Sequence, residues 1–394
     1  MHEIDTILST LRLEADPSLS PLFLQFEELY ERKLWHQLTQ SLILFFQDPK
    51  SVPLRLRVYD TFVTKFLDKI NQLDVVEFLL LSLKNHNDYS ESLHYLKDLE
   101  KSFDSIDSKK KRNDGLKNHN DSLLLIKIEI ARIYLYQNDL VQSRDILDDL
   151  ENTLDSKDTV PLRVTSAFYN VNSEYYRIKK DFNSFYYTSL LYLSTLDLTN
   201  DDVIMVYKDD FKELAYNLSI AALLGDKIYN FGELLNHQIT TFISGNSEYQ
   251  WLIQLLNALT LGDFKTFDSL ISVQIPKIQI LSEHESFLRQ KICLMTLIEI
   301  VFEKNIRNLS FDDIATSTHL SKDNVEHLVM KAISLGLLKG SIDQVNELVS
   351  ITWVQPRIIN SDQISKMKDR LVEWDEQVSK LGEKIENHGR SIWV

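Results

Sequence analysis

The sequence predicts an all-α protein: a helical-repeat solenoid, then a small module of two helices and a hairpin, then a long helix with heptad spacing. Gly and Pro are scarce, at 9 and 7 of 394 residues, whereas all-β folds need many turns. Apolar residues recur at steps of three and four up to about residue 308, which is typical of helices. The hydrophobic content of 44% is enough to build cores for two or three units.

Three turns of similar composition predict stacked helical hairpins. Each joins the end of one helix to the next through an Asp and an apolar residue: Asn138-Asp139-Leu140, Lys180-Asp181-Phe182 and Gly262-Asp263-Phe264, with Gly225-Asp226 as a weaker fourth. Similar turns at a regular interval are typical of solenoids. We therefore expect N-terminal helical repeats at 1–165 and a second helical part at 166–308.

The segment from Lys101 to Asp121 differs from its surroundings because few of its residues are apolar. It contains the basic run 109–112, followed by Asn and Gly. This composition predicts a flexible, protease-sensitive loop between helices. The basic run is either a solvated part of that loop or a nuclear import signal.

At Leu309 the pattern changes to two short helices. Ser310, with an acidic residue three positions later, predicts a helix N-terminus, and Ser321 predicts a second one. Gly336 then ends the second helix, as a residue in the left-handed conformation would.

A hairpin follows these helices. The stretch from Leu337 to Ile342 is extended, and 348–354 alternates in the pattern of a strand. Helix, turn, helix and hairpin together predict a winged helix at 309–358. We expect one edge of the hairpin to lie open for pairing with a neighbouring protein, through Val349, Ile351 and Trp353.

The last segment, 359–394, is predicted to be one long helix. Its apolar residues alternate between steps of three and four, which makes an a/d heptad seam: Ile364, Met367, Leu371, Trp374, Val378, Leu381 and Ile385. The seam either packs against the chain itself or joins a bundle with helices of other subunits. Because one chain cannot easily bury so long a seam, we predict the bundle.

Composition and motifs argue against several classes of function. The net charge of -15, with five acidic against three basic residues between Leu309 and Asp343, disfavours nucleic-acid binding by the winged helix. The one cysteine, Cys293, lies in an apolar run and is predicted to be buried.

Motifs of catalysis and cofactor binding are also missing from the sequence. The histidine pairs 86/94 and 319/327 lie in interrupted helices, so we expect no metal site. No nucleotide or hydrolase motif occurs, and we expect neither enzyme activity nor a cofactor. The chain also lacks a signal peptide and any apolar run long enough for a membrane span, which predicts an intracellular protein without membrane contact.

Four longer runs carry a resemblance to a known family. They are His284–Lys291, Asn324–Met330, Gly336–Val345 and Trp353–Arg357. With the order of helical array, winged helix and final helix, these runs resemble PCI-domain subunits of the regulatory particle lid of the 26S proteasome. The resemblance covers essentially the whole chain.

The resemblance implies a non-catalytic scaffold that supports lid assembly and ubiquitin-dependent degradation in cytoplasm and nucleus. Its implied partners are other PCI subunits, met through winged-helix edges and a helical bundle, and indirectly the lid deubiquitinase. A PCI subunit of the signalosome or of translation initiation factor three has the same architecture and stays an alternative. So does a PCI adaptor that binds nucleic acid.

Overall fold

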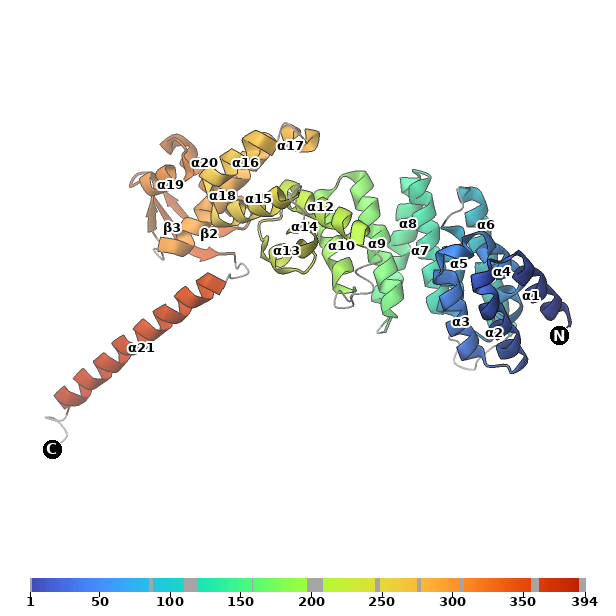
Figure 1. Ribbon diagram of the computed structural model, residues 1–394. Helices are drawn as coiled ribbons and strands as arrows, with labels where there is room; N and C mark the ends of the chain where they lie inside the picture. The colour runs from blue at the N-terminus through green and yellow to red at the C-terminus, as the bar shows by residue number, and fades with distance from the viewer. Residues whose placement is uncertain are drawn as a thin grey trace. The chain divides into compact units, whose positions relative to one another are not determined.

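The computed structural model describes residues 2–84, 88–109, 120–157, 159–196, 208–244, 249–274, 278–304, 308–355 and 361–389 (Figure 1). The chain forms two compact units, of which the first ends at Leu196. The division expected at residue 165 lies inside a helix that continues to Lys179. The division expected at 308 lies inside a short strand.

The first unit is helical throughout its described residues. Its elements are α1 (His2–Glu14), η1 (Pro17–Leu19), α2 (Ser20–Glu31), α3 (Trp35–Gln47), η2 (Pro49–Leu54), α4 (Arg55–Thr61), η3 (Val63–Phe66), α5 (Gln72–Leu83), α6 (Tyr89–Lys109), α7 (Asn120–Tyr136), α8 (Leu140–Asp155), α9 (Leu162–Lys179) and α10 (Phe182–Ser194).

Aromatic side chains form the core of the first four helices. The ring of Phe26 lies 5.7 Å from that of Phe23 and 5.9 Å from that of Phe45, both edge to face, and 6.1 Å from the stacked ring of Phe62. All four are fully buried. Such pairs stabilise a core beyond the burial of their area alone.

The first two predicted turns are confirmed. Asn138 and Lys180 both have positive φ, at 61°. The Asp that follows each one caps the next helix: Asp139 accepts a hydrogen bond from the Gln142 amide, and Asp181 accepts one from the Ser184 amide. Helices α7 and α8 therefore form one hairpin, and α9 and α10 form the next.

The loop prediction is wrong for residues 101–109 and 120–121. Helix α6 continues to Lys109, because Leu96, Leu99 and Phe103 keep its helical spacing and are buried in the core. Helix α7 begins at Asn120. The middle of the predicted loop, including Lys110 to Arg112, lies outside the described residues.

The second unit holds the remaining elements. They are α12 (Lys208–Leu224), α13 (Gly232–Asn236), α14 (Thr240–Ser244), α15 (Gln250–Leu261), α16 (Phe264–Gln274), α17 (Gln279–Glu283), α18 (Glu285–Lys304), β1 (Asn308–Ser310), α19 (Phe311–Thr318), α20 (Lys322–Ser334), β2 (Leu338–Asp343), β3 (Leu348–Val354) and α21 (Ser361–Gly389). Within the described residues, no helix is long and apolar enough to cross a membrane.

The Gly262 turn is confirmed, but the weaker Gly225 turn is not. Gly262 has a φ of 67°, and Asp263 accepts a hydrogen bond from the Lys265 amide. After Gly225 no helix begins until Gly232, so this turn does not open a fourth hairpin. The segment 225–231 is instead irregular backbone with buried aromatic residues.

The predicted winged helix is present. The Ser310 hydroxyl accepts a hydrogen bond from the Asp313 amide at 3.2 Å and so caps α19. Gly336 has a φ of 73°, and the Leu337 amide donates to the Ala332 carbonyl at 3.0 Å, which closes α20. Ser321 stands at the start of α20, but its side chain makes no capping bond there.

Candidate interaction surfaces

The heptad seam of α21 is exposed along its whole length. Its seven residues, Ile364, Met367, Leu371, Trp374, Val378, Leu381 and Ile385, are between 48% and 65% exposed. The seam is therefore not packed against the described part of this chain. Its spacing matches knobs-into-holes packing against other helices. That these residues form an interface stays a prediction.

The other face of α21 is polar. Glu376 and Lys380 form an exposed ion pair of 3.7 Å one turn apart. Surface ion pairs of this kind add little to the stability of a helix. A helix of this kind is stabilised mainly when its apolar face packs against other elements.

The sheet of the winged helix has a third strand that the sequence analysis missed. The strand order is β1-β3-β2, both pairs antiparallel, and β1 pairs Leu309 with Val349. Strand β3 is therefore central where β1 covers it, and Val349 and Ile351 are 1% and 5% exposed. The open edge expected at Val349 is covered by β1, and the side chains of both residues lie in the core. Only three residues long, β1 is too short to show strand periodicity.

Two features of the hairpin remain accessible. Among the described residues, β2 pairs only with β3, so its other edge is unpaired. Trp353 is 40% exposed, and the Lys339 ammonium lies 5.0 Å from its ring centroid, a cation–π contact across the two strands. Of the three predicted hairpin residues, Trp353 alone is positioned to meet a partner.

Two basic residues of the winged helix, Lys322 and Lys331, contact polar groups of this chain. Lys322 contacts Asp312 at 2.7 Å and Glu347 at 3.1 Å, and these hydrogen bonds raise its pKa. Lys331 is hydrogen-bonded to Gln290. Nucleic-acid backbones are bound by clustered basic groups that are free to meet phosphate, so this arrangement disfavours nucleic-acid binding.

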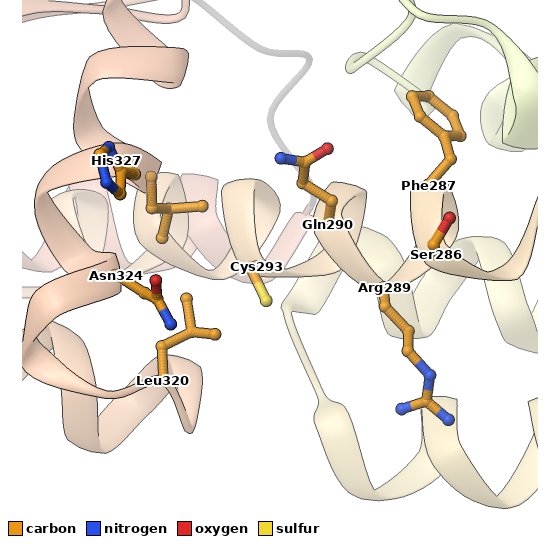
Figure 2. Close-up of a pocket in the computed structure, with 9 residues that line it drawn as sticks. Ser286, Phe287, Arg289, Gln290, Cys293, Leu320, Asn324 and His327 are labelled. Carbon is orange, nitrogen blue, oxygen red and sulfur yellow. The ribbon is translucent and has the colours of Figure 1, made fainter.

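A groove of about 560 Å³ lies between α18 and the start of α20. Figure 2 shows Leu320 and Asn324 across from Cys293, and His327 on the same wall as Asn324. Cysteine and histidine are a catalytic pair in some hydrolases, which makes the state of the thiol important. Burial raises the pKa of the Cys293 thiol, and the residue is only 9% exposed. A nucleophilic cysteine needs the opposite shift.

Alkylation of Cys293 tests whether its thiol is buried and unreactive or is an activated nucleophile. We expect iodoacetamide at neutral pH to modify the folded protein at least about tenfold more slowly than the urea-unfolded protein, since the raised pKa reduces the thiolate fraction. Mass spectrometry gives the rate without ambiguity because the chain has one cysteine. Faster reaction in the folded state would instead identify an activated thiol.

The histidines that the structure describes are not gathered into a metal site. His94 contacts Asp98 at 2.8 Å, and the His319 ring lies 5.3 Å from the ring of Phe264. His86 lies outside the described residues. Across the part of the chain that the structure describes, no three His, Cys, Asp or Glu residues are grouped as metal ligands.

Three family models match successive parts of the chain. The model of PSD13 N-terminal repeats matches residues 22–256, the PCI domain matches 272–353, and the Rpn9 C-terminal helix matches 357–389. The last match coincides with the exposed helix α21.

Two proteasome subunits match the chain over nearly its whole length. The chain is 68% identical to the 26S proteasome regulatory subunit RPN9 of Saccharomyces cerevisiae, over 100% of this chain and 99% of the relative. It is 34% identical to the 26S proteasome non-ATPase regulatory subunit 13 homolog B of Arabidopsis thaliana, over 92% of each. The chain is 28% identical to the eukaryotic translation initiation factor 3 subunit M of Nematostella vectensis, over 41% of this chain and 41% of the relative.

Proposed function

The chain belongs to the family of proteasome regulatory subunits that includes RPN9 and non-ATPase regulatory subunit 13, and we propose that it builds the regulatory particle lid as a non-catalytic scaffold. In fungi this subunit is counted ninth, and in animals thirteenth. Through the lid it supports ubiquitin-dependent degradation in cytoplasm and nucleus. The single observation that carries the scaffold role is the exposed seam of α21, because a seam without an internal partner serves to bind other helices.

The proposed partners are other PCI subunits of the lid, reached through two surfaces. The first is a helical bundle that buries the α21 seam, from Ile364 to Ile385. The second is pairing between the free edge of β2 and a neighbouring winged helix, with Trp353 beside it. Deubiquitinase subunits of the lid are met indirectly, and neither nucleic acid nor a membrane is a partner.

Amide exchange tests the β2 edge. In the free subunit, the β2 amides that point away from β3 have no strand partner, so we expect them to exchange rapidly. In the assembled lid they become at least about tenfold more protected, because a neighbouring strand accepts their hydrogen bonds. Hydrogen–deuterium exchange of peptides covering 338–343 measures the difference.

Peptides from α9, within the helical repeats, provide the internal reference for this comparison. Equal exchange of the β2 peptides in the free and assembled states would show that β2 is not part of the interface. That result would say nothing about the contact proposed for α21.

The alternative functions have weaker support. The likeness to an initiation factor subunit covers less than half of the chain, whereas the proteasome relatives match nearly all of it. A nucleic-acid adaptor would need free basic groups on the winged helix, where Lys322 is instead ion-paired. Affinity purification from cell extract distinguishes these assemblies by the subunits that accompany the chain.

A further inference from the structure

A lysine side chain lies in the interior of the second unit. Lys291 is only 1% exposed and shares the buried face of α18 with Leu288, Ile292 and Met295. Lysines are almost never fully buried without groups that compensate their charge. The groups around the amine therefore decide whether it is held as an ammonium ion or as a neutral amine.

Three backbone carbonyls surround the Lys291 amine at the C-terminal end of α12. Nζ donates hydrogen bonds to the carbonyl oxygens of Ala222 at 2.8 Å, Leu223 at 3.0 Å and Gly225 at 2.8 Å. The last carbonyls of a helix have no partner within it, and they lie at the negative end of its dipole. An ammonium ion has one N–H donor for each of the three oxygens. A neutral amine has only two and would turn its lone pair toward the third oxygen, so the three bonds require the charged form.

Aromatic rings complete the surroundings of the same amine. The ring centroids of Tyr229 and Phe231 lie 5.4 Å and 5.2 Å from Nζ, and that of Phe287 lies 5.6 Å from it. At such distances the negative face of a ring attracts a cation. The rings therefore favour the same charged form as the carbonyls, and they come both from segment 225–231 and from α18.

The charge of Lys291 is opposed by burial and supported by a carboxylate. Burial lowers the pKa of Lys291, and the carboxylate of Asp226 raises it. The Tyr229 hydroxyl is neutral beside the amine, because burial raises its pKa to about 12. The carbonyls, the rings and Asp226 thus replace the water that surrounds the ammonium group of an exposed lysine.

The groups around the amine come from parts of the chain that match different family models. Helix α12 and segment 225–231 lie within the match to the PSD13 N-terminal repeats, and α18 lies within the match to the PCI domain. Helix α18 also packs against α19 and α20 of the winged helix. Since segment 225–231 is irregular backbone, its position depends on side-chain contacts rather than on helical hydrogen bonds.

We propose that the end of α12, segment 225–231 and α18 form a binding site for a primary ammonium group, which Lys291 fills with its own charged side chain. The charge of this internal ligand holds the segment and the end of α12 on α18. Because the carbonyls and rings contact the ammonium end of the side chain, the site also takes a free alkylammonium ion of matching length once the side chain is truncated. This role goes beyond lid assembly, and its test needs no partner subunit.

Amide exchange of the full-length chain tests the need for the charge. Lys291→Met keeps an unbranched side chain of similar length but leaves the three carbonyls without donors. We therefore expect peptides covering 218–225, the last turns of α12, to lose at least about tenfold in protection. Leu288→Met, one turn earlier on the buried face of α18, is the matched control and changes this protection less than about threefold. Peptides from α9, in the other unit, are the internal reference. Unchanged protection in Lys291→Met overturns the proposal, because the charge would then hold nothing in place.

Truncation and replacement of the side chain test the site itself. Lys291→Ala removes every side-chain atom beyond Cβ, and n-propylammonium supplies the same atoms as a free ion. A cavity left by truncation can bind a small molecule that fits it. We expect Lys291→Ala to lose the protection of 218–225 and n-propylammonium chloride to restore it saturably, by at least about fivefold, because a ligand that binds the native state stabilises it.

Two controls separate charge from size and from ionic strength. The neutral 1-propanol has the same length as n-propylammonium, and sodium chloride gives the same ionic strength, so neither restores protection in Lys291→Ala. The unmodified chain gains nothing from n-propylammonium, because its site is filled. If Lys291→Ala does not fold alone, the compounds are present during refolding and circular dichroism gives the readout. Equal recovery with 1-propanol, or no recovery with either compound, overturns the ammonium site.

Discussion

We expect replacement of Leu371 and Trp374 by Asp to prevent the subunit from entering the lid while the rest of its fold stays intact. Both residues lie at the middle of the seam and are 63% and 65% exposed in the free chain. Full burial of such a side chain contributes roughly 1.5–3 kcal/mol, so losing two lowers affinity about 100- to 10,000-fold. The two introduced carboxylates would also be desolvated in the bundle, which adds to the loss.

A matched variant separates the seam from a general effect of charge. Ser365→Asp with Ser379→Asp adds the same two charges to α21 at exposed positions beside the seam rather than in it. We expect this control to assemble normally. Native gel analysis of lid particles measures incorporation, and circular dichroism confirms that both variants remain helical. Normal assembly of the Leu371 and Trp374 variant would show that the seam has no partner.

Gly340→Ala separates β2 from β3. A Cβ at this position would stand 2.2 Å from the Ser350 carbonyl oxygen and 3.1 Å from the Ile351 Cα, both of them backbone atoms that cannot rotate away. The register of the two strands already shifts between Lys339 and Gly340. We expect the winged helix to lose about 3 kcal/mol or more, since overpacking against backbone forces the strands apart. Exchange of the amides in β2 and β3 measures the loss.

Two other glycines provide controls for the same substitution. Gly336 has a φ of 73° but open space around it, so Gly336→Ala incurs only the backbone strain, about 1 kcal/mol. Gly382, inside α21, also has open space, and Ala there favours the helix by about 1 kcal/mol. The expected order of destabilisation is 340, then 336, with 382 stabilising. Equal effects at 336 and 340 would mean that the close approach to β3 relaxes at little cost.

Much of the fold follows from local sequence signals. The Asp residues of the first two predicted turns and Ser310 all cap helices, because each signal requires only a few consecutive residues. The heptad spacing of α21 likewise predicted one continuous helix. In α6 the polar composition misled the prediction, although Phe103 still keeps the spacing of the buried face.

The features that could not be predicted from the sequence depend on contacts between residues far apart in the chain. Strand β1 pairs with a strand about 40 residues later, and its three residues carry no strand pattern of their own. That pairing turned Val349 from a predicted edge residue into a core residue. Lys291 follows Leu288 by three residues and precedes Met295 by four, which places it on the apolar face. This spacing was a visible signal, but its carbonyl partners lie more than 60 residues away.

The exposed seam also bears on how much of this chain a cell can hold. A copy made without its partners displays seven large apolar side chains in one row, the kind of surface that favours aggregation and chaperone capture. On the proposed function, binding of partner helices would remove that surface and stabilise the native chain by mass action. We therefore expect the supply of partner subunits to limit the amount of soluble chain, and surplus copies without a place in a particle to be cleared first.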